Sequence, residues 1–284
     1  MNRRAVLKAI GSAALLPLLP RRLYASTNFR RRRPSDAAWP SKSAWKQLDE
    51  AVGGNLISVS FPLSAFKTNP AGAAVKLLSE KVTNPYYIGD DPGLTQTFGW
   101  VDAWATKPSV YAVAARNAQD IAEAVNFARD NDLRLVVKGG GHSYQGTSNA
   151  PDSLLIWTRH MNDIAMHTGF VPQGCEHTVK PQPAVTVGAG TIGMQAYQAV
   201  TTKGGKYVQG GGCTTVCLGG LVQSGGFGSY SKHYGSAAGN LLEAEVVTAD
   251  GRIRVANACT NPDLFWALKG AEAAPSAWLT LKRK

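Results

Sequence analysis

The stretch that decides the fold reads Lys138-Gly-Gly-Gly-His-Ser-Tyr-Gln-Gly146, and it follows a short apolar run at residues 133–137. Three successive glycines after an apolar strand let the backbone come close to a ligand and direct bare N–H groups at it, which suits a diphosphate. The loop then presents one histidine, His142. This loop is therefore the first candidate ligand site of the chain.

A second glycine-rich run, Gly210-Gly-Gly-Cys-Thr-Thr-Val-Cys-Leu-Gly-Gly220, presents a cysteine in place of the histidine. Cys213 follows His142 by 71 residues. A third cluster, Gly225-Gly-Phe-Gly228, comes soon after. The chain thus carries two nucleophilic side chains, each on a loop that allows close approach of the backbone to a ligand.

The pattern before the first loop predicts a strand, a helix and a strand. Residues 109–114 alternate as a strand does, and Asn117 is placed to cap a helix that ends at Asp130-Asn131. Residues 133–137 form the second strand. Strands joined by a helix normally lie parallel, so the loop emerges at the carboxyl end of its strand, where open α/β sheets bind ligands.

The rest of the chain gives a coarser pattern of short elements. We expect strands at 154–158 and 184–187, a helix at 192–202, a β-hairpin from 241–248 and 252–256, and a short helix at 264–268. Before the first loop, we expect a helix at 43–52 capped by Ser43, and a loop at 84–93.

The run Gly188-Ala-Gly-Thr-Ile-Gly193 matches the G-x-G-x-x-G pattern of Rossmann dinucleotide sites. Such a site also requires an acidic residue about 20 positions onward, for the ribose. No Asp or Glu occurs from His177 to Leu242, and the next acid is Glu243. The sequence therefore disfavours a nicotinamide site, and the acid-free span leaves nothing to repel a diphosphate.

The net charge of +11 belongs to the beginning of the chain. Residues 1–33 hold nine basic residues and no acid, whereas residues 34–284 hold 21 basic and 19 acidic residues. The remainder is nearly balanced, which excludes nucleic acid as the expected partner.

The basic start, Asn2-Arg3-Arg4-Ala5-Val6-Leu7-Lys8, resembles the twin-arginine export signal. An apolar segment at residues 9–19 follows it, but 11 residues broken by Pro17 are too few to span a bilayer of roughly 30 Å. We expect recognition by the twin-arginine export machinery, cleavage near Ala25, a periplasmic or secreted protein and no stable membrane anchor. The alternative is a disordered basic arm.

The four cysteines do not form a metal pattern. Cys213 and Cys217 are four residues apart with no histidine at zinc spacing, so we expect no metal site. An exported protein can pair some of its cysteines, and the pairing of Cys175, Cys217 and Cys259 stays open.

Taken in order, these motifs resemble the FAD-binding domain of p-cresol methylhydroxylase and vanillyl-alcohol oxidase-type flavoproteins, and most of all their berberine bridge enzyme and oligosaccharide oxidase branch. The resemblance rests on Lys138-Gly-Gly-Gly-His-Ser-Tyr144, the run around Cys213, Gly225-Gly-Phe-Gly228 and Ala244-Glu-Val-Val-Thr-Ala-Asp-Gly251. It covers residues 106–270. It implies an α+β, two-subdomain FAD-binding fold.

The resemblance implies a flavin attached twice, through His142 to the 8α-methyl group and through Cys213 to the adjacent ring carbon. The alternatives are a histidine that only donates a hydrogen bond to a phosphate, and a small buried thiol. Cys217 and Leu221 depart from the family pattern. The expected cofactor-binding residues are Gly139, Gly140, Gly141, His142, Ser143, Tyr144, Gly146, Gly212, Cys213, Val216, Gly219, Gly220, Gly225, Gly226, Gly228 and Val246.

The resemblance also divides the chain. We expect a signal peptide and basic segment at 1–33, a leader that packs on the main domain at 34–105, the FAD-binding domain at 106–270 and an aberrant tail at 271–284. After Leu268-Lys-Gly270 the family pattern is lost, which suggests a truncated or frame-shifted gene and a missing substrate domain. The general base is expected there, so no catalytic residue is assigned; Tyr144 and Tyr230 are expected to be packing residues.

The expected function is an FAD-dependent oxidoreductase. By resemblance, an alcohol or carbohydrate hydroxyl loses its proton to a base, hydride passes to the flavin, and oxygen reoxidises it. Two alternatives remain: a non-catalytic FAD-binding fragment, and a nucleotide-sugar reductase with non-covalent FAD.

Overall fold

The computed structural model describes residues 30–269 and 280–283. Residues 32–284 form one compact unit; a second unit, residues 1–31, contributes only Arg30 and Arg31 to the described part. The predicted export signal therefore lies almost wholly outside the described residues, as does most of the predicted tail.

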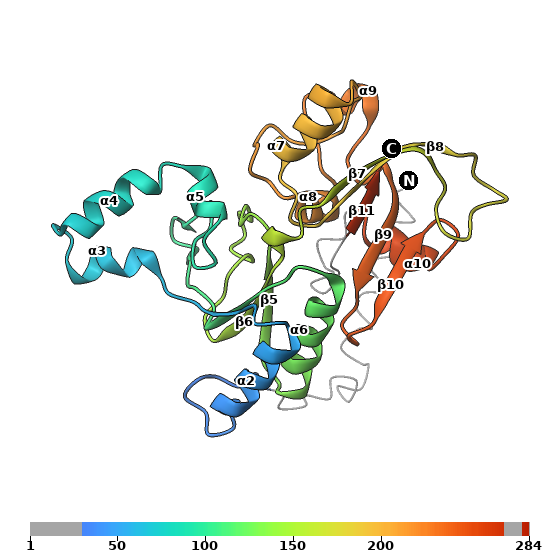
Figure 1. Ribbon diagram of the computed structural model, residues 1–284. Helices are drawn as coiled ribbons and strands as arrows, with labels where there is room; N and C mark the ends of the chain where they lie inside the picture. Colours follow the sequence, from blue (N-terminus) through green and yellow to red (C-terminus); the bar gives the residue numbers. More distant parts are fainter. Residues whose placement is uncertain (1–29, 270–279, 284) are drawn as a thin grey trace, which may run out of the picture. The chain divides into compact units, whose positions relative to one another are not determined.

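A four-stranded sheet carries the first glycine-rich loop (Figure 1). Its strands lie in the order β1-β4-β6-β5, with β4, β6 and β5 parallel and β1 antiparallel at the edge. The predicted parallel strands are confirmed, with β6 inserted between them. The bounds are β1 Leu56–Ser58, β4 Tyr111–Ala114, β5 Arg134–Lys138 and β6 Ser153–Trp157.

Helix α6, Ala118–Asp130, connects β4 to β5 and was predicted from its cap and spacing. The Asn117 side chain accepts a hydrogen bond from the Asp120 amide at 3.0 Å, and the Asp120 carboxylate accepts one from the Arg116 amide at 2.8 Å. These contacts satisfy amides that the first turn leaves without partners. The apolar face of α6 is buried in the core of this sheet.

The segment at 34–105 contributes to the same core. Helix α2, Lys42–Ala51, packs on α6 through Trp45, whose ring centroid lies 4.9 Å from that of Phe127. The cap of α2 is Ser41, which accepts from the Ala44 amide; the prediction of Ser43 is wrong because Ser41 holds the extended conformation that a cap requires.

Short elements fill the rest of residues 59–105. The predicted loop at 84–93 contains the helix α5, because Asn84 caps the Tyr86 amide and Pro85 takes the first helical position. The bounds are η3 Pro62–Ser64, α3 Ala65–Thr68, α4 Ala73–Lys81, α5 Pro85–Gly89, β2 Gly99–Trp100 and β3 Trp104–Ala105.

The second sheet is antiparallel throughout, in the order β10-β9-β11-β8-β7. The β9–β10 hairpin and β8 confirm the predicted strands, whereas β7 is an edge strand whose irregular burial leaves no alternation to recognise. The bounds are β7 Ile164–Phe170, β8 Gln182–Val187, β9 Leu241–Val247, β10 Ile253–Asn257 and β11 Thr280–Arg283.

Strand β11 belongs to the predicted tail, yet it pairs with both β8 and β9. Strands β8 and β9 each offer an edge of N–H and C=O groups to a strand lying between them. The expectation that residues 271–284 are an aberrant tail, not native to the fold, stays a prediction. The predicted origin of the tail, and the boundary at Gly270, stay predictions.

Helices between β8 and β9 pack with this sheet in a second core. The predicted helix at 192–202 is found as α7 followed by the π-helical turn η5. The predicted helix at 264–268 corresponds to α10. The bounds are η4 Thr158–His160, α7 Gly193–Ala196, η5 Tyr197–Lys203, α8 Leu218–Gln223, α9 Ser231–Tyr234 and α10 Pro262–Ala267.

A disulfide joins Cys175 to Cys259, so the pairing that the sequence left open is decided, with Cys213 and Cys217 free. Within residues 30–269 and 280–283, no helix is long and apolar enough to cross a membrane. The same residues contain no group of three His, Cys, Asp or Glu side chains placed to hold a metal ion.

Candidate cofactor site

The first glycine-rich loop leaves β5 at Lys138 and carries His142 to the second loop. The His142 Nε2 lies 3.0 Å from the Thr215 Oγ1. Burial lowers the pKa of His142, and its hydrogen bonding to Thr215 opposes this in part. The structure thus brings the predicted histidine against the predicted second loop and favours its neutral form.

The glycines at 139–141 are explained by the packing of the chain on itself. A Cβ at Gly139 would lie 2.6 Å from the Cys217 Cβ, and one at Gly140 would lie 2.5 Å from the Thr215 carbonyl oxygen. Gly141 has a φ of 78°, which favours glycine. Contact between the two loops, and not only approach to a ligand, therefore requires glycine here.

The remaining predicted residues of the first loop lie at its outer part. The Ser143 hydroxyl lies 2.7 Å from that of Thr147, and the Tyr144 carbonyl accepts a hydrogen bond from the Trp104 indole at 3.1 Å. Gly146, with a φ of 75°, packs against the Trp104 ring. Residue Tyr144 is 72% exposed, and its ring lies edge-on to that of Trp100 with the centroids 6.3 Å apart.

Backbone hydrogen bonds join the second run to residues 189–194. These tie both ends of the Thr214–Gly219 stretch, including the predicted residues Val216 and Gly219, to the G-x-G-x-x-G run. The bonds go from Met194 N to Thr214 O, Gly193 N to Val216 O, Leu218 N to Thr191 O and Gly219 N to Ala189 O, at 2.9 to 3.1 Å.

The G-x-G-x-x-G run itself has a structural explanation. A side chain at Gly188 would meet the Met161 backbone, and one at Gly190 would meet the Thr158 backbone, so both positions need glycine for packing on η4. The preceding strand β8 is antiparallel to both its neighbours. A Rossmann site needs a parallel β-α-β unit, so this run lacks the required context.

The two free cysteines differ in accessibility. Cys213 is exposed, whereas Cys217 is buried and donates from its Sγ to the Gly190 carbonyl at 3.3 Å. Burial raises the pKa of Cys217 to about 12. Since the thiolate is the reactive form, Cys217 is chemically quiet and Cys213 alone is open to a ligand.

The second and third glycine clusters contain open positions. A Cβ at Gly212, Gly220 or Gly225 would meet no heavy atom within 4 Å. By contrast, a Cβ at Gly226 would clash with the Ala237 Cβ, and one at Gly228 would clash with the Gly210 backbone. The open positions leave room beside the backbone near Cys213, as a bound cofactor would need.

Val246, a predicted cofactor residue, lies in the core and not on a glycine-rich loop. It lies on β9, fully buried in the second core. Its side chain packs with other apolar groups, which leaves only its backbone for a contact with a ligand.

Sequence reasoning missed residues 85–96, which we call the bridging segment. The Lys138 ammonium donates to the carbonyls of Asp91, Pro92 and Leu94. The Tyr86 hydroxyl lies 3.2 Å from that of Thr214 in the second loop. A lysine at the end of a buried strand was the available signal, since such a group needs acceptors from elsewhere in the chain.

Asp90 of the bridging segment also forms an ion pair with Arg159 at 2.8 Å. The Arg159 side chain is only 12% exposed and follows β6 in the turn η4. Both loops and the end of the parallel sheet therefore meet at the bridging segment.

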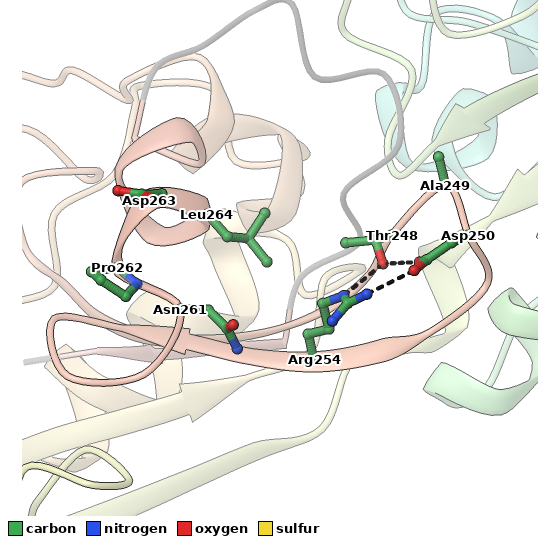
Figure 2. Close-up of a pocket in the computed structure, with 8 residues that line it drawn as sticks. All are labelled: Thr248, Ala249, Asp250, Arg254, Asn261, Pro262, Asp263 and Leu264. Carbon is green, nitrogen blue, oxygen red and sulfur yellow. Dashed lines mark hydrogen bonds and ion pairs between the residues drawn. The ribbon is translucent and has the colours of Figure 1, made fainter.

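An open pocket lies away from the two glycine-rich loops (Figure 2). Its volume is about 670 Å³, and it lies between the turn of the β9–β10 hairpin and α10. Arg254 points between Thr248 and Asp250 and hydrogen-bonds to both. The Thr248, Asp250 and Arg254 side chains hydrogen-bond with one another, and none of the predicted cofactor residues lines the pocket.

Comparison with known proteins identifies the family. The FAD binding domain family matches residues 109–257 of this chain. The VAO-type flavoprotein oxidase VAO615 of Thermothelomyces thermophilus is 35% identical over 255 residues, which cover 84% of this chain and 43% of that protein.

Solved structures show the same fold. The VAO-type flavoprotein MtVAO615 of Myceliophthora thermophila C1 aligns with a TM-score of 0.76 and 31% identity, over 89% of this chain and 49% of that one. Berberine bridge enzyme from Eschscholzia californica aligns with a TM-score of 0.59 and 22% identity, over 85% of this chain and 42% of that one, which shows the fold alone.

The described chain spans about half the length of the relatives it matches. The predicted α+β FAD-binding fold is confirmed, as is the resemblance on which it rested. The chain belongs to the FAD binding domain family and is a vanillyl-alcohol oxidase-type, FAD-linked oxidoreductase homologue.

Proposed function

We propose that this chain holds FAD between its two glycine-rich loops, with His142 and Cys213 attached to the flavin, as part of an enzyme that oxidises an alcohol or carbohydrate hydroxyl. The observation that carries the proposal is the hydrogen bond between His142 and Thr215. Thr215 follows Cys213 by two residues, a separation that extended chain spans in about 7 Å. Both nucleophiles are thus within reach of one ring edge.

The residues at this position fit the cofactor. The open sides of Gly212, Gly220 and Gly225 leave room along the backbone. Exposed N–H groups of glycine-rich turns suit a diphosphate. Residues 177–242 carry no acid that would repel it.

The two attachment residues are assigned by what surrounds them. The lowered pKa of His142 keeps its imidazole neutral, and in the tautomer whose Nε2 donates to Thr215 the Nδ1 atom has the free lone pair. Cys213 supplies the exposed thiol. His142 and Cys213 would each give up one hydrogen on attachment, and the bound flavin with oxygen as acceptor would supply the two-electron oxidation that each new bond needs.

Bound FAD supplies a hydride acceptor and passes electrons on to oxygen. The names of relatives support this reading, since VAO615 is described as a flavoprotein oxidase. The relatives are about twice as long. We assign the substrate pocket and the general base to the part of the enzyme that corresponds to their unmatched half.

A second candidate is an FAD-binding fragment without turnover. The stretch that this chain shares with VAO615 is 43% of that protein's length, and it contains both proposed attachment residues. Such a fragment would bind and attach the flavin but would not reduce it with substrate.

Export by the twin-arginine route is part of the proposal. The disulfide between Cys175 and Cys259 supports an oxidising destination, periplasmic or extracellular. Replacement of Arg3 and Arg4 by lysine should leave the protein in the cytoplasm. Unchanged export of that variant would contradict this route.

The decisive experiment is denaturation of purified protein in acid. Retention of yellow flavin on the polypeptide supports attachment, and peptide mapping should place it on His142 and Cys213. Flavin released entirely into the supernatant would overturn attachment. Retained flavin that candidate alcohols and sugars do not bleach would favour the fragment.

A further inference from the structure

Lys138 is a buried lysine that the proposed chemistry does not use. Lys138 is only 3% exposed. It lies where β5 ends and the first glycine-rich loop begins. Its ammonium donates to the carbonyl oxygens of Asp91, Pro92 and Leu94 at 3.1, 2.6 and 2.7 Å. An ammonium has three donors, so all three are used on one short stretch of the bridging segment.

Besides Lys138, the Asp90–Arg159 ion pair and a hydrogen bond from the Asn149 amide to the Gly93 carbonyl hold the bridging segment. Its helix α5 has five residues, too few to be stable alone. Ile88 and Leu94 are its buried side chains among the large apolar residues. The polar contacts to neighbouring loops must therefore supply much of its order.

Those contacts reach both proposed attachment loops. The Gln96 amide donates to the Gly141 carbonyl at 2.9 Å, next to His142. At the other end, the Tyr86 hydroxyl lies 3.2 Å from that of Thr214, next to Cys213. A single segment thus touches the residue beside each attachment point.

We propose that Lys138 is a positioning residue which, by gathering the carbonyls at 91–94, holds the bridging segment in place and so sets the spacing of the His142 and Cys213 loops. This inference rests on the proposed function, since spacing matters only where both loops attach one flavin. Attachment needs two nucleophiles at fixed points on one ring edge, and small errors in position are costly for such reactions.

The test uses Lys138→Met, which keeps the length of the stem and removes the three donors. Lys107→Met, at an exposed lysine, is the matched control. Amide hydrogen exchange is measured on the whole chain at about pH 6, where the Lys138 amine is charged and has all three donors. We expect exchange at 91–96, 139–142 and 213–216 to accelerate at least about tenfold in Lys138→Met, and no change in the control.

Flavin attachment is then measured separately at each residue. Cys213→Ser leaves attachment through His142, and His142→Ala leaves attachment through Cys213. Adding Lys138→Met should lower the attached fraction to below about half in both backgrounds, because both loops shift. A loss in one background only, or in neither, would overturn the proposal.

Tyr86→Phe is a second, milder variant that keeps the proposal testable if Lys138→Met does not fold. It removes one hydroxyl from a residue that is 37% exposed, and it should accelerate exchange at 213–216 alone. Faster exchange confined to 91–96 in Lys138→Met, with both loops unchanged, would show that Lys138 merely stabilises the segment. If the wild type carries no attached flavin, the proposed function fails, and the exchange data still decide the role of Lys138.

Discussion

The two glycine-rich loops look alike in sequence but are built differently. In the first, Gly139 and Gly140 press against Cys217 and Thr215 of the second, with no space for a side chain. In the second, Gly210 and Gly219 are also crowded, but Gly220 and Gly212, the neighbour of the exposed Cys213, face open space. The first loop is therefore shaped mainly by protein contacts, and the second keeps room for a ligand.

The difference shows that a position in a loop can require glycine for more than one physical reason. A glycine is required where another part of the chain comes too close for a Cβ, or where φ is positive, as at Gly141. It is also found where a ligand approaches the backbone. The two cases have opposite consequences for stability and for cofactor binding, and the predictions below separate them.

The largest effect is expected from removing both attachment residues. In His142→Ala combined with Cys213→Ser, all flavin should leave the polypeptide on acid denaturation, whereas each single variant should retain it through the other residue. Absorbance of the precipitated protein measures this. Flavin retained by the double variant would assign attachment to a different side chain.

The next effect concerns Lys138, which supports the first loop. Burial lowers its pKa to about 7, with Asp91 opposing; in the unfolded chain lysine titrates near 10.4. Between these values only the unfolded chain keeps the proton, so the free energy of unfolding rises with pH. Below about pH 7 the cost of the buried charge is fully present.

Denaturant unfolding at several pH values measures this effect. The free energy of unfolding of the wild type, relative to Lys138→Met, should rise by on the order of a few kcal/mol between about pH 6.5 and 9.5. Parallel pH profiles for the two proteins would mean that Lys138 titrates as an exposed lysine does.

A smaller effect separates the two kinds of glycine. Gly140→Ala should lower the free energy of unfolding by about 1–3 kcal/mol, because its Cβ would lie 2.5 Å from the Thr215 carbonyl oxygen. Gly212→Ala should change it by less than about 0.5 kcal/mol, since nothing lies within 4 Å. Gly212→Ala should nevertheless weaken flavin retention. Equal stability losses in both variants would remove the distinction between the loops.

The smallest effect concerns the thiols. In cofactor-free protein, an alkylating reagent should modify Cys213 and leave Cys217 intact until unfolding, because Cys217 is buried with a pKa of about 12. Cys217→Ser keeps a donor for the Gly190 carbonyl and should cost only about 1 kcal/mol. Rapid modification of Cys217 in the folded protein would contradict its burial.

Much of the fold around the first loop could be predicted because it depends on local patterns. Asn117 and the apolar spacing of α6 define a helix whatever surrounds them. The edge strand β7 could not be predicted, because its burial does not alternate. The helix α5 was missed because a Pro and Gly-rich stretch is typical of loops.

The candidate site shows the same division. Histidine and cysteine on glycine-rich loops are visible as motifs, so His142 and Cys213 could be proposed from sequence. The role of the bridging segment could not be predicted from sequence, since its contacts with Lys138, Gly141 and Thr214 join residues that are far apart in the chain. No local pattern records such pairings.

By itself, the sequence determined the strand-helix-strand unit, the two loops with their nucleophiles, the absence of acids from the second loop and the family. These follow from residue type and spacing, which are properties of the chain before it folds. Only the tertiary structure decided which glycines serve packing, which cysteine is accessible, and which segment connects the two loops. Those depend on distances between residues remote in sequence, and such distances exist only once the two cores have formed.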